Sequence, residues 1–332
     1  MGKKFLCKVR TRIIGGFALI LCSLIVLSYF QYLPANADEE IVVDMVAHRG
    51  YSGLYPENTL SAFAGAVACG VETVEFDVRK TKDGVLVIYH DDTLENITGD
   101  ETTIADYTYD ELMAFDAGSW YSDAYICERI PTLDQALDIL SASGVKIFCE
   151  LKDIGEDPEF PAEVYMTVED HGMLDRVVFS SFNYNYLAAI KTIDEDQPIM
   201  VLASFGKSNL PTKYPAEYYG INMKTLTSKT IVAIHDAGAL VYAYTPDTRG
   251  QVLGLQRLGV DGVITNYPDM DKGSYVDEIA VEESSSTEDA LDESGTASDM
   301  SEDILEETED AIDKFIEENN SNINQRMEEN EE

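Results

Sequence analysis

The sequence predicts a (β/α)8 barrel between a hydrophobic N-terminal segment and an acidic C-terminal tail. Eight short runs rich in β-branched residues are separated by stretches with a helical pattern. Most of these runs are continuously apolar, which is typical of parallel strands covered by helices. Five of the helical stretches are followed by a glycine, where helix C-caps commonly have one: Gly70, Gly144, Gly172, Gly238 and Gly259.

The predicted elements alternate along the chain as βα units do. We expect strands near residues 42–47, 72–78, 145–151, 176–181, 199–204, 219–222, 239–244 and 261–265. Helical patterns fall near 57–69, 131–143, 160–172, 183–194, 227–237 and 249–258. Residues that favour helix N-termini support three of these starts: Pro131-Thr132, Asn183 and Thr227-Ser228. The pattern alone also allows an open, doubly wound sheet, but no glycine-rich phosphate loop follows any strand.

The interval between the second and third predicted strands is too long for a simple crossover. It runs from residue 78 to residue 145. It contains an extra strand at 85–89 after the turn Asp83-Gly84, and a helix at 109–115. We interpret this interval as a small insertion over the mouth of the barrel.

The first 37 residues form a separate segment. They contain five basic residues and no acidic one, with an apolar run over residues 13–30. A basic start, an apolar run and the small residues Ala35 and Ala37 are typical of an export signal cut after Ala37. The apolar run is also long enough for an uncleaved membrane anchor. In both cases we expect the domain to be extracytoplasmic, either secreted or anchored to the cell membrane.

The rest of the chain divides into a globular part, residues 38–276, and a tail, residues 277–332. The tail has 22 acidic and two basic residues, and this composition predicts disorder. We expect no nucleic-acid partner, because the net charge of the chain is −39 and its basic residues cluster only near the N-terminus. Membrane contact is expected only through residues 13–30 if they are not cleaved, and the sequence identifies no protein partner for the tail.

Polar and charged residues gather where the first three predicted strands end. His48 and Arg49 end the first strand, and Glu75 and Asp77 end the second. Residues two apart in a strand share a face, so these two carboxylates should point together and repel each other. A hard divalent cation, Ca²⁺ or Mg²⁺, is the natural partner of such a pair. Active sites of (β/α)8 barrels lie at this end of the strands.

Several motifs together resemble the glycerophosphodiester phosphodiesterase family from about Val42 to Pro268. In chain order they are Ala47-His48-Arg49-Gly50, Pro56-Glu57-Asn58-Thr59, Glu75-Phe76-Asp77, His90-Asp91, Phe115-Asp116-Ala117-Gly118-Ser119-Trp120, Arg129-Ile130-Pro131-Thr132-Leu133, Glu150-Leu151-Lys152 and Gly259–Pro268. Each motif alone is weak, but their order and spacing form a specific signal. One segment differs: the family often has Trp-Thr-Val-Asn where this chain has Tyr244-Thr245-Pro246-Asp247.

The resemblance implies a metal-dependent phosphodiesterase site. It makes Glu75, Asp77 and Glu150 the ligands of one divalent cation. It makes His48 and His90 the general acid and base, a role that suits histidine because it titrates near neutral pH. The other two histidines, His171 and His235, lie near predicted helix ends, and we expect structural roles for them.

Five further residues are expected to bind substrate. Arg49 and Lys152 would hold the phosphate, or pair with the nearby carboxylates. Glu57 would orient Arg49 or contact substrate, or it would lie in the first turn of a helix, where an acid is favoured. Trp120 and Tyr244 would form aromatic walls against the glycerol backbone, or belong to the core.

The expected function is hydrolysis of a small glycerophosphodiester to glycerol 3-phosphate and an alcohol. Two alternatives remain at this stage. One is a phospholipase-type phosphodiesterase that acts on lipid headgroups. The other is a catalytically inactive binding protein of the cell envelope, although such a protein should have lost part of the residue set that is complete here.

Overall fold

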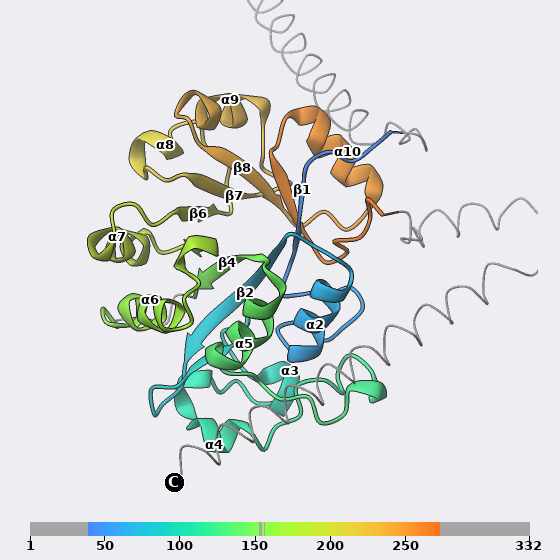
Figure 1. Cartoon of the computed structure of the whole chain (residues 1–332), viewed down its shortest axis with the longest axis vertical. Helices are drawn as coiled ribbons and strands as arrows, with labels where there is room; N and C mark the ends of the chain where they lie inside the picture. The colour runs from blue at the N-terminus through green and yellow to red at the C-terminus, as the bar shows by residue number, and fades with distance from the viewer. Residues whose placement is uncertain (1–38, 153–154, 156, 273–332) are drawn as a thin grey trace, which may run out of the picture.

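In a computed structural model, which describes residues 39–152, 155 and 157–272, eight parallel strands close a barrel with helices around it (Figure 1). Around the ring the strands follow the order β1-β9-β8-β7-β6-β5-β4-β2, and pairing of β1 with β2 closes it. The predicted (β/α)8 barrel is therefore confirmed. Its strands are β1 (Asp44–Ala47), β2 (Thr73–Lys80), β4 (Lys146–Leu151), β5 (Val177–Ser181), β6 (Ile199–Ala203), β7 (Tyr218–Asn222), β8 (Leu240–Tyr244) and β9 (Gly262–Thr265).

The helices lie outside the barrel and connect successive strands. They are α2 (Leu60–Ala68), α5 (Leu133–Ser143), α6 (Phe160–Asp170), α7 (Tyr184–Ile193), α8 (Leu210–Lys213), α9 (Ser228–Asp236) and α10 (Arg249–Leu258), with a 3₁₀ turn η3 (Leu174–Arg176) before β5. All five glycines that were expected to end helices have positive φ, a conformation that glycine adopts without strain.

Two predictions about helices were wrong. The first helix begins at Leu60 rather than at residue 57, because Asn58 has φ +58° and Thr59 is the N-cap, whose side chain accepts from Ala62 N–H. The single turn α8 was not predicted, because four residues are too few to show a helical period.

Alternation along the strands divides the apolar residues into two layers. On β2, Val74, Phe76 and Val78 belong to the large core beneath the helices, whereas Glu75 and Asp77 alternate with them and face the barrel interior. A second apolar cluster fills the interior of the barrel. It contains Val46, Phe148, Val178, Met200, Leu202, Tyr242 and Ile264. Packing there is close enough that a Cβ at Gly262 would lie 2.2 Å from the Tyr242 ring. The barrel is thus a filled core, and its acidic residues Glu75 and Asp77 lie toward the rim.

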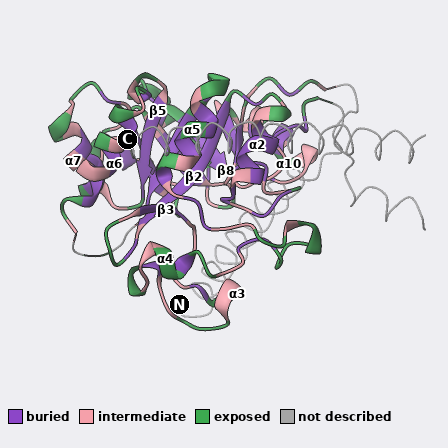
Figure 2. Cartoon of the chain, turned by 60° about the horizontal axis from the view of Figure 1, so that its bottom comes forward, coloured by how far each residue is buried: buried purple, intermediate pink, exposed green. Residues whose placement is uncertain are grey.

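The insertion between β2 and α5 is confirmed and has a small core of its own. Strand β3 (Leu86–Ile88) pairs antiparallel with β2, and short helices follow: α3 (Glu95–Thr98), η1 (Ile104–Asp106), α4 (Tyr109–Leu112) and η2 (Asp123–Tyr125). The predicted helix 109–115 therefore ends earlier, at Leu112. The insertion's own core contains Val87, Leu94, Ile104, Leu112, Ala117 and Ile130. Figure 2 shows α3 and α4 beside the ends of β2 and β3, away from the buried strands of the barrel.

The predictions for residues 1–37 and 277–332 lie outside the described residues. Within the described part of the chain, no helix combines the length and the apolar character needed to span a membrane.

Candidate active site

The carboxyl ends of three neighbouring strands bring the predicted residues together. His48 and Arg49 follow β1 directly, and Lys152 follows β4. The register pairs Asp77 on β2 with Glu150 on β4, so these inward-facing carboxylates lie side by side. The barrel closure between β1 and β2 brings Arg49 next to them, and its backbone N–H donates to Glu75 Oε2 at 2.9 Å.

Glu75, Asp77 and Glu150 form a buried acidic cluster. Their carboxylate oxygens lie within 4.8 Å of one another, and each residue is at most 7% exposed. Burial and the charge of Asp77 raise the pKa of Glu75, and raise that of Glu150 to about 7. Burial also favours the protonated form of Asp77, but Arg49 and then Lys152 hold its pKa below the usual range. Three oxygen donors with this excess of negative charge suit a hard divalent cation.

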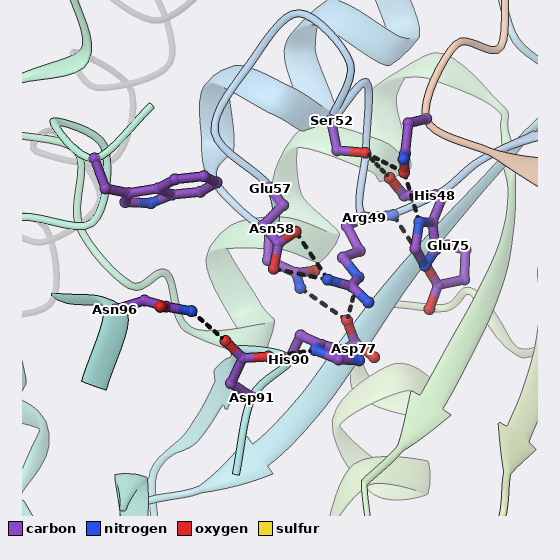
Figure 3. A network of polar contacts seen from close by, with 12 residues as sticks. His48, Arg49, Ser52, Glu57, Asn58, Glu75, Asp77, His90, Asp91 and Asn96 are labelled. Atoms are coloured by element: carbon purple, nitrogen blue, oxygen red, sulfur yellow. Dashed lines mark hydrogen bonds and ion pairs between the residues drawn. The ribbon is translucent and has the colours of Figure 1, made fainter. Parts of the chain in front are cut away.

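Two basic side chains border the acidic cluster. Arg49 Nη1 lies 2.8 Å from both carboxylate oxygens of Glu57, and its Nε lies 3.6 Å from Asp77 Oδ2 (Figure 3). Lys152 Nζ lies 3.0 Å from Glu150 and 3.6 Å from Asp77. Arg49 also has φ +56°, a rare conformation for a residue other than glycine, as found at functional sites. The side chains of Arg49 and Lys152 can therefore both contact an anion that binds over the acidic cluster.

The two candidate catalytic histidines have different partners. His48 Nδ1 lies 2.7 Å from Asn266 Oδ1, and burial together with the Arg49 charge lowers the pKa of His48 to about 3. His90 comes from the insertion, after β3, and its Nδ1 lies 2.7 Å from Asp91 Oδ1. Asn96 Nδ2 donates to the other oxygen of Asp91 at 2.7 Å. Figure 3 shows both imidazoles near Arg49 and the acidic residues.

The backbone around His90 is held from β2. Arg79 Nη2 donates to the His90 carbonyl at 2.8 Å and lies 2.6 Å from Asp92 Oδ1. Arg79 is only 6% exposed, so its charge is directed at this loop. The side chain thus ties the loop of the second histidine to the strand that carries Glu75 and Asp77.

A cavity of about 280 Å³ opens beside Arg49 and His90, between the barrel and the insertion. Its lining residues are Arg49, Glu57, Asn58, Thr59, Ile88, Tyr89, His90, Asp91, Asn96, Ile97, Ala117, Trp120 and Ile130. Trp120 therefore faces the site from the insertion. Tyr244 does not line this cavity: its hydroxyl donates to the Ala203 carbonyl at 3.1 Å, and its ring contacts Phe182 edge to face. Of the two predicted aromatic walls, Trp120 lines this cavity, and the role of Tyr244 stays a prediction.

The geometry excludes one of the interpretations of Glu57. This residue lies before α2, so it does not occupy the first turn of that helix. Both of its carboxylate oxygens accept from Arg49 Nη1, and it lines the cavity. Glu57 therefore pairs with the Arg49 guanidinium group, and its position in the cavity lining also allows the predicted contact with substrate.

Several polar residues of the site were not predicted. Asn58 is 3% exposed and donates to Asp77 Oδ2 at 2.8 Å. Asp91 and Asn266 accept from the two histidines, and Asp247 accepts from Asn266. Asn266 directly follows the last strand, so the rule that placed His48 at a strand end could also have identified it.

Comparisons with known proteins match the family that the sequence resembles. A model of the glycerophosphoryl diester phosphodiesterase family matches residues 48–270. A glycerophosphodiester phosphodiesterase of Bacillus altitudinis is 33% identical over 231 residues, which cover 67% of this chain and 94% of that protein. One from Caldanaerobacter subterraneus is 29% identical over 229 residues, with 68% and 94% covered. The solved structure of an Oleispira antarctica phosphodiesterase in complex with the product sn-glycerol-3-phosphate has a TM-score of 0.65 and 32% identity, with 69% of this chain and 95% of that chain covered.

Proposed function

This chain belongs to the glycerophosphoryl diester phosphodiesterase family, and we propose that it hydrolyses glycerophosphodiesters with one divalent cation and the two histidines His48 and His90. The reaction would release glycerol 3-phosphate and an alcohol. The observation that carries the proposal is the buried cluster of Glu75, Asp77 and Glu150 beside two basic side chains. Both the hydrolysis and its substrate class are supported by the relatives described above.

The three carboxylates would hold the cation, Ca²⁺ or Mg²⁺. When bound, such an ion polarises phosphoryl oxygens and stabilises the charge that develops on them. The raised pKa values of Glu75 and Glu150 are consistent with this assignment, because they arise first from burial and then from the charge of Asp77, and a cation would offset both. Asp77 differs, because Arg49 and Lys152 already stabilise its charge.

Arg49 and Lys152 would bind the diester's phosphate. Glu57 holds the guanidinium group by Nη1 and Nε lies toward Asp77, which leaves Nη2 for phosphate oxygens. Lys152 supplies a point charge from the β4 side. Together they would place the phosphorus atom above the acidic cluster and between the two imidazoles.

His48 and His90 would transfer the protons. One ring removes the proton from the attacking hydroxyl, of water or of the substrate's own glycerol, and the other protonates the departing alcohol oxygen. Nδ1 of each ring lies 2.7 Å from a side-chain oxygen of the protein. This contact would leave Nε2 of each ring for the substrate.

The test is hydrolysis of glycerophosphocholine by the purified chain, with glycerol 3-phosphate as the measured product. We expect activity with added Ca²⁺ or Mg²⁺, loss of activity in EDTA, and recovery when the ion is restored. His48→Ala should lose roughly 10²–10⁴-fold in kcat. The matched control is His171→Ala, which removes a histidine bound to the Thr167 carbonyl and to acids of α5, outside the site.

The same assay separates this proposal from its alternatives. Hydrolysis of phospholipid vesicles at a rate similar to that of glycerophosphocholine would favour a phospholipase-type activity. Full activity after exhaustive removal of divalent ions would reject the role of the acidic cluster.

We also propose an extracytoplasmic location, from the basic and apolar features of residues 1–37. Fractionation of cells that produce the full chain should recover it in the medium or on the outer face of the membrane. Recovery in the cytoplasm would contradict this proposal.

A further inference from the structure

Three loops at the rim of the barrel meet at the side chain of Asn266, which follows β9. Its Oδ1 lies 2.7 Å from Nδ1 of His48, which follows β1. Its Nδ2 donates to Asp247 Oδ2 at 3.0 Å, and its backbone N–H donates to Asp247 Oδ1 at 3.1 Å. Because β8, β9 and β1 are neighbours in the barrel, these contacts run around the rim from Asp247 to the imidazole.

The partners of Asn266 fix the orientation of its amide. A carboxylate accepts hydrogen bonds and donates none, so the amide NH₂ must face Asp247 and the amide oxygen must face His48. The reverse orientation would place two oxygens against each other. Ser52 Oγ lies 2.7 Å from the His48 carbonyl oxygen and 2.8 Å from Asn266 Oδ1, and its single proton can be donated to one of these acceptors at a time.

This orientation determines which nitrogen of His48 carries the proton. An amide oxygen has no hydrogen to donate, so Nδ1 must be the donor in the 2.7 Å contact. A neutral imidazole has one N–H group, and its second nitrogen then carries a free lone pair. The contact therefore leaves Nε2 of His48 to exchange a proton.

We propose that Asn266 and Asp247 are positioning residues that keep the His48 proton on Nδ1 and its Nε2 available to the diester. This inference deepens the proposed function, on which it rests through the role of His48. Asp247 lies in the segment in which the sequence departs from the family's usual Trp-Thr-Val-Asn. Here its carboxylate binds both N–H groups of Asn266.

The first experiment observes the tautomer directly and needs no enzymatic activity. Two-bond ¹H–¹⁵N spectra of the full chain, labelled at its four histidines, show which ring nitrogen is protonated. Loss of one signal set in His48→Gln assigns the ring. We expect Nδ1–H in the wild type and a shift toward Nε2–H in Asn266→Ala. Identical ring shifts in both proteins would overturn the proposal.

The second experiment exchanges the two side chains. Asn266→Asp alone places two carboxylates side by side, and kcat should fall by about tenfold or more with KM nearly unchanged. Adding Asp247→Asn restores a matched pair, because the new amide can donate to the new carboxylate and still accept the backbone N–H. The double variant should therefore recover most of the lost kcat.

The pH dependence of kcat/KM distinguishes a positioning role from a purely structural one. A purely structural role of Asn266 and Asp247 would leave this pH dependence unchanged in the double variant. A carboxylate in contact with Nδ1 favours the imidazolium, so the limb of the kcat/KM profile that belongs to His48 should move to higher pH in the double variant. Arg49, Asp77 and His90 also act on His48 electrostatically and remain unchanged. A double variant as slow as Asn266→Asp, or one with an unshifted profile, would contradict the proposal.

The two experiments separate failure of this inference from failure of the proposed function. An inactive wild-type protein that still shows Nδ1–H at His48 would reject the function and keep the positioning role. An active wild-type protein with an unchanged tautomer in Asn266→Ala would reject only the positioning role.

Discussion

The barrel rim and the insertion each contribute one histidine to the site, but they hold it differently. His48 follows a barrel strand, and its ring is held by the neutral amide of Asn266. His90 lies in the insertion, and its ring is held by the carboxylate of Asp91, which is 36% exposed. Burial and then the charge of Arg49 lower the pKa of His48 to about 3. The rim and the insertion thus supply chemically different surroundings for the same side chain.

The two regions also differ in how firmly they fix their other groups. The acidic cluster lies on strands whose register is set by the closed barrel, and its members are buried. Trp120 of the insertion is 50% exposed and belongs to a short loop. We infer that the rim supplies the chemistry shared by diester substrates, and that the insertion shapes the cavity for one substituent of the diester.

The largest expected effect is on the rim. Glu75→Gln removes one of the proposed cation ligands and should lower kcat by roughly a hundredfold or more, since a bound ion would contribute several kcal/mol to stabilising the transition state. Ca²⁺ or Mg²⁺ should raise the melting temperature of the wild type but not that of the variant. Glu72→Gln, an exposed acid just before β2, is the matched control. A variant that stays active and still responds to the ion would contradict the assignment.

The second prediction concerns the insertion histidine. Asp91→Asn removes the charge beside His90 Nδ1, so the proton is no longer held there, and kcat should fall about tenfold to a hundredfold. The neighbouring Asp92→Asn is the control, because Asp92 is 91% exposed and pairs with Arg79 rather than with the ring. Equal losses in the two variants would show that the loop matters only as a structural unit.

A smaller effect is expected at the cavity wall. Trp120→Ala should raise KM by about tenfold with little change in kcat, because a hydrophobic contact binds substrate and transition state alike. Ile126→Ala is the control, since Ile126 is 57% exposed and does not line the cavity. A fall in kcat with unchanged KM would mean that Trp120 acts on the reacting groups.

The smallest expected effect is the pH dependence of stability. In the ion-free protein the pKa of Glu150 is raised to about 7, above its ordinary value, so the folded state binds this proton more tightly than the unfolded state. Glu150 therefore contributes to the free energy of unfolding at low pH, and this contribution is lost as the pH rises through about 7. A bound cation replaces the proton. The increase in melting temperature caused by Ca²⁺ or Mg²⁺ should therefore be greater at pH 8 than at pH 6.

The sequence predicted the barrel better than the details of the rim. Strands such as β6 are continuous apolar runs, and Glu75, Asp77 and Glu150 have the spacing and position that strand geometry requires. The contacts of Asn266 and Asp247 could not be predicted, because they depend on which loops the closed barrel brings together. Tyr244 was assigned to the pocket from its motif; its contacts with Ala203 and Phe182 depend on the closed barrel, and its role as a pocket wall stays a prediction.

The most direct test of the cation site is a crystal structure of the full chain with Mn²⁺ and glycerol 3-phosphate, with the metal located by anomalous scattering. We expect one peak in contact with carboxylate oxygens of Glu75, Asp77 and Glu150, and the phosphate between His48 and His90. A peak elsewhere, or a phosphate bound away from both imidazoles, would contradict the proposed site.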